Sequence, residues 1–301
     1  DIVVLGDSFS YIRPESQWQN YLTAASGESI ATLYIGKIRL AQILSSRVFL
    51  ERPPKVLVVE SVERLLPAHL TEEVPSCSGP LPSLPDNRSE DGPAFQRRGE
   101  SESGYAGATA YVERATSIFD VKLAYVRDFL WHNLLRRLTG VEHTSTVKLE
   151  LCASPPFSSM NRTAMLVYSD DFKKIEWWRK AGESEMSCRI DAMRRQVEAN
   201  GYTRFVLMVP PDKLTTFAEY LCDGAWKGVS RLSRLSEIRP ESIPRLDQAL
   251  ASAVRKGEMD IYLPNDTHWG SNGQRIAAET LASFLRQRDR IHSRGSDRAR
   301  D

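Results

Sequence analysis

The sequence predicts an α/β fold of three layers, in which helices cover both faces of a mostly parallel central sheet. Short runs of apolar, β-rich residues at 2–5, 54–60 and 205–209 have the continuity typical of strands buried on both faces. Segments with helical spacing separate such runs almost throughout the chain, and this alternation is typical of a parallel sheet. The sequence contains no internal repeat.

The first third of the chain gives the clearest strand and helix boundaries. The strand at 2–5 ends at a glycine, and helices are expected at 18–25 and 38–46 before the strand at 54–60. From about 72 to 107 the composition changes to proline, serine, glycine and charged residues. We expect this stretch to be a mobile surface insertion, because it is too long for an ordinary connection.

The remaining two thirds continue the alternation. The apolar spacing at 115–138 predicts a long amphipathic helix, and Gly201 is a fitting end for a helix at 186–200. Further elements are expected as strands at 146–151, 164–168, 205–209 and 261–263 and as helices from about 214, at 244–256 and at 272–287. We therefore expect one domain over 1–288, followed by a charged, disordered tail at 289–301.

The composition excludes some classes of protein. Hydrophobic residues make up 41% and charged residues 26% of the 301 positions, which is typical of a globular protein. The net charge of +1 gives no electrostatic reason to expect nucleic-acid binding. No apolar run approaches the roughly 18 residues of a membrane helix. The chain starts at Asp1, so a removed N-terminal segment, such as a signal peptide or a membrane anchor, is compatible with it.

The four cysteines leave the redox state open. They lie at positions 77, 152, 188 and 222, and no two have the close spacing of a zinc site, so no metal is expected. Two disulfides, in any of three connectivities, and four reduced thiols fit the count equally well. If the compartment is oxidising, we expect at least one bridge, with Cys188–Cys222 preferred because each flanks a helix of the same half.

A serine follows the first predicted strand in a way that favours nucleophilic chemistry. The segment 6–10 (Gly-Asp-Ser-Phe-Ser) places the Ser8 hydroxyl where the strand breaks into a turn. The carboxyl edge of an α/β sheet is where active sites gather, and the Ser8 backbone N–H can there help to bind an oxyanion. The alternative is that Ser8 only caps the following turn, with Asp7 orienting that turn.

A second motif supplies the groups that a serine nucleophile requires. In the segment 266–269 (Asp-Thr-His-Trp), a carboxylate precedes an imidazole by two residues on one tight loop. Asp266 can then bond Nδ1–H of His268 and leave Nε2 free as a base. As a lone histidine, His268 would more simply be a turn residue, with Asp266 as a helix N-cap. The two motifs together favour a Ser8–His268–Asp266 triad.

The other histidines and a tryptophan pair give weaker signals. The histidines at 69, 132, 143 and 292 have no partner pattern in the sequence, so structural or solvated roles are expected for them. The pair Trp177-Trp178 could form a carbohydrate-stacking platform, but packing in the core is the expected role.

The serine and histidine motifs resemble those of the SGNH (GDSL) hydrolase superfamily. The segment 266–273 (Asp-Thr-His-Trp-Gly-Ser-Asn-Gly) is similar to a motif of its AlgX/AlgJ-like branch, the alginate O-acetyltransferases. The segments 209–213 (Val-Pro-Pro-Asp-Lys) with Tyr220 and 60–64 (Glu-Ser-Val-Glu-Arg) also resemble segments of that branch. The resemblance implies a three-layer SGNH-like fold and marks Arg64, Lys213 and Trp269 as candidates for substrate binding.

Two departures from that branch bear on the mechanism. The serine here precedes the Asp-His motif, as in ordinary SGNH enzymes, so the order looks circularly rearranged, which a fold tolerates if its termini lie close. The Gly-x-Asn-Asp block, which supplies an asparagine oxyanion donor, is absent, and Glu60-Ser61 stands in its approximate place. We therefore expect an oxyanion hole formed by the backbone N–H groups of Ser8 and Gly36.

These observations predict an O-acetyltransferase that modifies hydroxyls of an exported polysaccharide through an acyl-enzyme on Ser8. An acetylesterase is the alternative within enzymes, and a catalytically silent polysaccharide-binding module of an export complex is the alternative outside them. No metal or soluble cofactor is expected. The resemblance implies a membrane-bound acetyl-donor partner, a polysaccharide or oligosaccharide substrate and a periplasmic or other extracytoplasmic location.

Overall fold

The computed structural model describes residues 1–11, 17–77, 97–98, 145–159 and 162–298, with separate helical positions between 127 and 138. Most of the predicted insertion at 72–107, and most of the expected helix at 115–138, lie outside the described residues. The helical positions within 127–138 agree with the prediction for that segment.

The central sheet has the strand order β4-β2-β1-β3-β7. Four of its strands are parallel, namely β1 (Ile2–Gly6), β2 (Ile30–Tyr34), β3 (Val56–Glu60) and β7 (Arg204–Met208). The short β4 (Arg97–Arg98) pairs antiparallel with β2 at one edge. The α/β fold with a mostly parallel sheet is thus confirmed.

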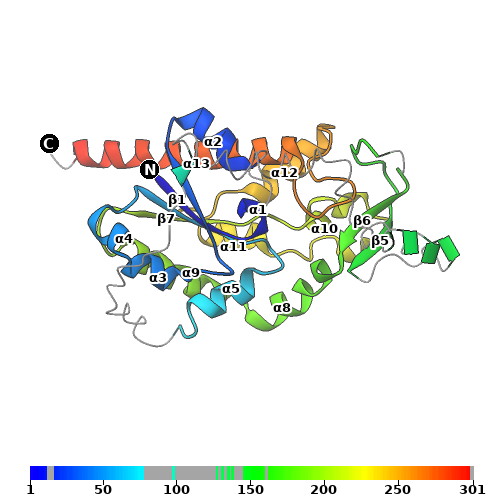
Figure 1. Cartoon of the computed structure of the whole chain (residues 1–301), viewed down its shortest axis with the longest axis horizontal. Coiled ribbons are helices and arrows are strands. Elements are labelled where there is room, and N and C mark those ends of the chain that lie inside the picture. The colour runs from blue at the N-terminus through cyan, green and yellow to red at the C-terminus, as the bar shows by residue number, and fades with distance from the viewer. Residues whose placement is uncertain are drawn as a thin grey trace.

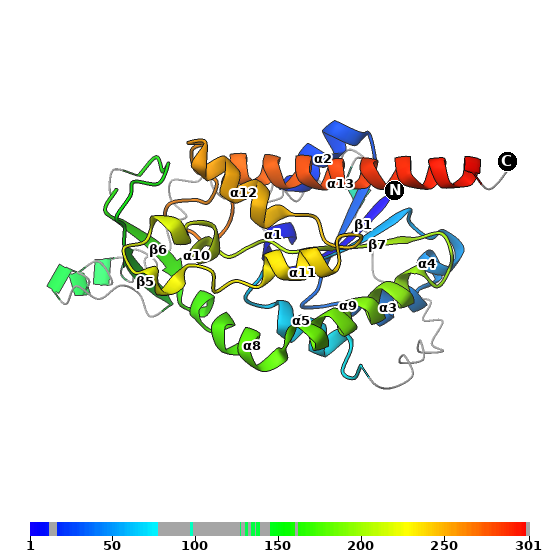
Figure 2. The same cartoon turned by 180° about the vertical axis from the view of Figure 1, so that it is seen from behind.

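Side chains of the parallel strands alternate between two apolar cores, one on each face of the sheet. In β1, for example, Ile2 and Val4 belong to one core, whereas Val3 and Leu5 belong to the other. The first core is covered by α2 (Trp18–Ser26), α12 (Leu246–Arg255) and α13 (Ser271–Arg298). The second core is covered by α3 (Leu40–Ser45), α4 (Arg47–Glu51), α5 (Leu66–Glu73), α9 (Glu183–Glu198) and α11 (Leu232–Ile238). Figures 1 and 2 show these two helical layers above and below the sheet.

A smaller antiparallel sheet lies at one end of the molecule (Figure 1). It consists of β5 (Thr146–Glu150) and β6 (Ala164–Tyr168), both at the predicted positions. The short helical elements near it are η2 (Ser169–Phe172), α8 (Lys174–Ala181), α10 (Lys213–Thr216), η3 (Ala218–Tyr220) and η4 (Gly224–Trp226).

Two predicted elements differ from the structure. The residues 261–263 do not form a strand of the sheet, because Tyr262 forms only an isolated bridge with Trp269. Leu263 N donates to His268 O at 3.0 Å, so the chain turns back and pairs with itself. The expectation of a disordered tail from 289 was wrong as far as Arg298, since α13 continues to that residue. Asp1 and the last turns of α13 lie at the same end of the molecule in both views (Figures 1 and 2).

Candidate active site

Ser8 lies where β1 meets the short helix α1 (Ser8–Tyr11), at the carboxyl edge of the parallel strands. Asp7 O accepts hydrogen bonds from the backbone N–H groups of Ser10 and Tyr11, both at 3.1 Å, and so forms the first helical turn. A Cβ at Gly6 would lie 2.6 Å from Ser10 Cβ, so only glycine fits this close turn. The turn leaves the Ser8 side chain half-buried.

The Ser8 hydroxyl contacts the imidazole of the second motif. His268 Nε2 lies 2.9 Å from Ser8 Oγ, and His268 Nδ1 lies 2.7 Å from Asp266 Oδ1. The same carboxylate oxygen accepts a hydrogen bond from the backbone N–H of His268 at 3.1 Å. The three groups therefore have the geometry of a nucleophile, a base and an orienting carboxylate.

The buried carboxyl groups of Asp7 and Glu60 hold the turn that contains Ser8 through hydrogen bonds. Asp7 Oδ1 accepts from Phe9 N at 3.0 Å, and Asp7 Oδ2 accepts from Val62 N at 2.7 Å. Glu60 Oε2 accepts from Asp7 N at 3.0 Å and from Ser10 Oγ at 2.7 Å. Asp7 therefore orients the turn, and it also joins the turn to the chain after β3.

Glu60 is fully buried beside Asp7, and its electrostatics follow from that position. Burial, followed by the charge of Asp7, raises the pKa of Glu60 well above its usual value. Its surroundings therefore favour the protonated form more than solvent would. The sequence placed Glu60 at the site of the missing Gly-x-Asn-Asp block but gave no sign of this support beneath the nucleophile.

Backbone donors near Ser8 could bind an oxyanion. Among the described residues, no acceptor is found for the backbone N–H of Ser8 or for that of Gly36. Gly36 follows β2, whose last residue, Tyr34, pairs with Gly6 of β1. A Cβ at Gly36 would lie 2.6 Å from the Tyr34 ring, so the ring packs directly on the Gly36 backbone. The structure is thus compatible with the expected Ser8–Gly36 pair of donors.

Ser61, which stands in part of the place of the missing Gly-x-Asn-Asp block, contacts a histidine on α5. Ser61 is buried, and its Oγ lies 2.8 Å from Nδ1 of His69 on α5. Burial lowers the pKa of His69. His69 therefore has a partner that its sequence context did not indicate, and a structural role for it agrees with the prediction.

The three substrate-binding candidates have buried side chains, which lie near the loop that bears Asp266 and His268. Lys213 is fully buried, and its Nζ donates to backbone carbonyls of Leu263, Pro264 and Asp266. Trp269 is 3% exposed and packs edge-on against Phe9, with ring centroids 4.9 Å apart.

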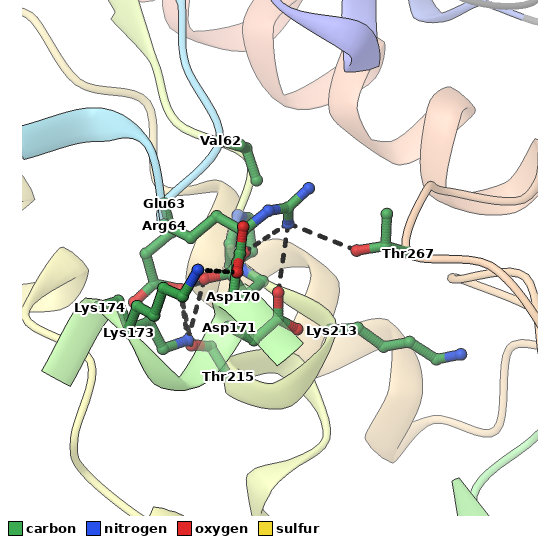
Figure 3. Close-up of polar contacts among 12 residues, drawn as sticks. Val62, Glu63, Arg64, Asp170, Asp171, Lys173, Lys174, Lys213, Thr215 and Thr267 are labelled. Atoms are coloured by element: carbon green, nitrogen blue, oxygen red, sulfur yellow. Dashed lines mark hydrogen bonds and ion pairs between the residues drawn. The ribbon is translucent and has the colours of Figure 1, made fainter. Parts of the chain in front are cut away.

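The Arg64 side chain is 7% exposed and lies within a buried ionic cluster (Figure 3). Arg64 Nη1 contacts Asp212 Oδ1 at 2.8 Å, Asp171 Oδ1 at 3.3 Å and Thr267 Oγ1 at 3.4 Å. Lys174 completes the cluster, with its Nζ 3.1 Å from Asp212 Oδ2 and 3.2 Å from Glu63 Oε2.

No local sequence pattern indicates this cluster, which is formed by Glu63, Arg64, Asp171, Lys174 and Asp212. Its members come from three separate segments, and nothing in the local pattern around Asp171 or Lys174 marks either residue as special. Glu63, Arg64 and Asp212 lie in the two segments that resemble the AlgX-like branch. This resemblance is the only feature of the sequence that could have drawn attention to these three residues. Burial raises the pKa of Asp171 to about 8, with the charge of Asp212 as the next contribution.

The cysteine pairing also differs from the prediction. The bridges are Cys77–Cys188 and Cys152–Cys222, and no described cysteine is free. The preferred pair, Cys188–Cys222, was therefore wrong, although the expectation of at least one bridge agrees with the structure. The reason is spatial: α5, which precedes Cys77, packs on α9, and Leu151 bridges Leu221 directly before Cys152 and Cys222.

The remaining candidates add no second site. Trp178 is buried, as expected for core packing, while the side chain of Trp177 and those of His132, His143 and His292 lie outside the described part. The described residues contain no group of three or more His, Cys, Asp or Glu side chains able to hold a metal ion. None of the described helices combines the length and apolar character that crossing a membrane requires.

An α/β sheet with a Ser–His–Asp arrangement at the carboxyl edge of its strands is the architecture that the resemblance to SGNH proteins led us to expect. Residues 166–300 match the family described as SGNH hydrolase-like domain, acetyltransferase AlgX. Over these residues the match agrees with the resemblance seen in the sequence. The matched residues include Asp266 and His268, whereas Ser8 lies before them. No curated protein and no solved structure gives a significant match.

Proposed function

We propose that this protein is a polysaccharide O-acetyltransferase that works through an acyl-enzyme on Ser8. The observation that supports the proposal is the contact of Ser8 Oγ with His268 Nε2 at 2.9 Å, together with Asp266 at Nδ1. The AlgX-type match agrees with an acetyl group as the transferred group and a polysaccharide as the acceptor.

The first half-reaction acetylates the serine. Ser8 Oγ attacks the carbonyl carbon of the donor ester while His268 Nε2 takes the hydroxyl proton. The backbone N–H groups of Ser8 and Gly36 stabilise the oxyanion of the tetrahedral intermediate. The intermediate collapses when the leaving alkoxide takes the proton from His268, and acetyl-Ser8 remains.

The second half-reaction transfers the acetyl group. A sugar hydroxyl gives its proton to His268 Nε2 and attacks the acetyl carbonyl, and Ser8 Oγ leaves and recovers that proton. Asp266 accepts the Nδ1–H hydrogen bond throughout, which fixes the tautomer and stabilises the imidazolium. This chemistry requires neither a metal nor a soluble cofactor from the protein.

Water in place of the sugar hydroxyl would make the protein an acetylesterase. One observation favours this second candidate: the serine precedes the Asp-His motif, as in ordinary SGNH hydrolases. A silent polysaccharide-binding module is disfavoured because all three triad groups are present in contact. The two disulfides support an extracytoplasmic location, and a membrane-bound partner remains our proposed source of acetyl groups.

Incubation with an activated acetyl ester, with and without an oligosaccharide acceptor, tests the proposal. Mass spectrometry should find acetyl on Ser8 and, when the acceptor is present, acetyl on the sugar. Acetyl-Ser8 that is lost only to water would establish the esterase. A parent protein that neither becomes acetylated nor turns over the ester would rule out the acyl-enzyme.

A further inference from the structure

Two buried cations contact the loop that bears Asp266 and His268, and both approach it from the interior of the protein. Lys213 Nζ donates to Leu263 O at 2.8 Å, to Pro264 O at 2.9 Å and to Asp266 O at 3.2 Å. An ammonium group has three N–H donors, so these carbonyls use all of them. Lys213 has no ion pair with any other described residue.

The second cation, Arg64, approaches the same loop one residue further along. Its Nη1 lies 3.4 Å from Thr267 Oγ1, and Thr267 stands between the two triad residues of the loop. The guanidinium also lies over the Tyr168 ring, 5.2 Å from its centroid. Figure 3 shows Arg64 between the acidic residues and Thr267, whereas Lys213 points away from the ionic cluster.

The ionic cluster fixes these cations to the central sheet. Asp212, the residue directly before Lys213, binds Arg64 through Oδ1 and Lys174 through Oδ2. Its backbone N–H donates to Glu63 Oε2 at 3.0 Å, and this bond joins the chain after β7 to the chain after β3. Both lysine and arginine are thus anchored at the ends of two core strands.

The charge of Lys213 is costly to bury and therefore calls for an explanation. Three carbonyl oxygens converge on Nζ, and an apolar side chain there would leave them without donors in a buried site. Because the loop has little regular structure, these bonds define its conformation. A misplacement of about 1 Å in a catalytic group can lower a rate by about 10²-fold.

We propose that Lys213 is a positioning residue for the catalytic loop, assisted by Arg64, and that it acts in its ammonium form. It sets the loop conformation in which Asp266 orients His268 and His268 Nε2 meets Ser8 Oγ. The proposal rests on the proposed function, since it assigns a role within the same site.

The central test is the substitution Lys213→Met, which keeps most of the side-chain volume but removes the donors. Turnover of a small acetyl ester should fall about 10²-fold in kcat, with KM changed less than twofold, because substrate does not touch Lys213. The variant Lys213→Arg retains a charge and donors and should recover part of kcat. Equal kcat for Lys213→Met and the parent would overturn the proposal.

The dependence of kcat on pH distinguishes a positioning role of Lys213 from a merely structural role. Burial lowers the pKa of Lys213 to about 8, against the raising effects of Asp171, Asp266 and Asp260, which face it. Above that pH the neutral amine has two N–H donors for three carbonyls, so kcat of the parent should fall. This alkaline limb should be absent from Lys213→Met and present in Asp171→Asn, since Asp171 also titrates near this pH. A limb that persists in Lys213→Met would contradict the proposal.

A direct readout of the loop covers the case in which Lys213→Met folds poorly. In Thr267→Val only the contact to Arg64 is lost, so a well-folded protein with a modest loss of kcat is expected. Proton NMR should show the His268 Nδ1–H signal, shifted downfield by Asp266, in the parent and weakened in both variants. This signal can be measured without turnover, so the two proposals can fail separately. An inactive parent protein would contradict the proposed function. An NMR signal that is unchanged in both variants would contradict the positioning role of Lys213.

Discussion

His268 Nε2 lies 2.9 Å from Ser8 Oγ, although 260 positions separate the two residues in the chain. The contact forms because β1 delivers Ser8 to the carboxyl edge of the sheet, while α13 packs on α2 and fixes the loop before it over the same edge. The pairing of Leu263 N with His268 O then closes that loop on itself. The site therefore depends on packing of the two ends of the chain against each other.

The triad contact predicts the effects of removing its members. Ser8→Ala and His268→Ala should each abolish nearly all turnover of a small acetyl ester, and the double variant should lose no more, because the two groups act as one unit. Asp266→Ala should retain more activity, since an imidazole without its partner still acts as a base part of the time. Steady-state kinetics of the four proteins measures these losses.

Ser45→Ala is a suitable control for these variants, because its hydroxyl bonds only to backbone carbonyls within α3. It should keep parental kinetics. Ser8→Ala should still bind an oligosaccharide, because the loss of one hydroxyl leaves the surrounding surface intact. Parental rates for Ser8→Ala would reduce Ser8 to a turn residue and end the acyl-enzyme proposal.

The raised pKa of Glu60, which lies beneath the nucleophile, predicts a pH-dependent stability. Its pKa is raised by burial in the folded state, so above the ordinary value of 4.5 the folded protein binds a proton that the unfolded chain has released. Stability contributed by Glu60 is therefore complete at acid pH and declines as the pH rises above that value. Glu60→Gln removes the titration, so the variant should gain free energy of unfolding relative to the parent between pH 5 and pH 8.

Urea unfolding at the two pH values measures this difference. Glu60→Gln should also keep most of the esterase activity, because its amide oxygen can still accept from Asp7 N and Ser10 Oγ. A variant that gains nothing between pH 5 and pH 8 would show that Glu60 is ionised in the folded protein.

Local patterns predicted three of the four parallel strands and the triad, but they missed β2 and failed where the structure depends on distant segments. Apolar continuity located β1, β3 and β7 within a residue or two, since a strand buried on both faces must be apolar throughout. The motif at 266–269 placed His268 correctly because its carboxylate partner is only two residues away. The burial of Lys213 and Arg64 was not visible in the sequence, since a charged residue near a motif looks the same in sequence whether it faces solvent or a ring of carbonyls.

The disulfides illustrate the same limit. Position along the chain favoured Cys188–Cys222, whereas the bridged cysteines are far apart in sequence: Cys77 and Cys188 by 111 positions, and Cys152 and Cys222 by 70. Only the packing of α5 on α9, and the bridge between Leu151 and Leu221, brings each pair together.

Digestion without reductant should therefore yield two linked peptide pairs, Cys77 with Cys188 and Cys152 with Cys222. Each bridge closes a long loop of the unfolded chain, so its removal by paired Cys→Ala substitution should cost about 4 kcal/mol of unfolding free energy. Mass mapping and urea unfolding give the two readouts. A linked Cys188–Cys222 peptide would contradict the observed packing, and four free thiols in protein alkylated without reductant would count against an extracytoplasmic location.

The last prediction concerns the start of α13, where the backbone passes very close to the segment before the catalytic loop. A Cβ at Gly273 would lie 2.1 Å from Ile261 O and 2.9 Å from Trp269 Cβ, and neither atom belongs to a flexible side-chain end. Gly273→Ala should therefore push α13 from the loop and lower the unfolding free energy by about 2–3 kcal/mol. Gly224→Ala is the matched control, because a Cβ there meets nothing within 4 Å and its φ is not positive. Because the displaced segment carries His268, Gly273→Ala should also lose esterase activity at temperatures where it remains folded. Equal stability of the two alanine variants in urea unfolding would show that α13 can move away without cost and that its packing does not fix the catalytic loop.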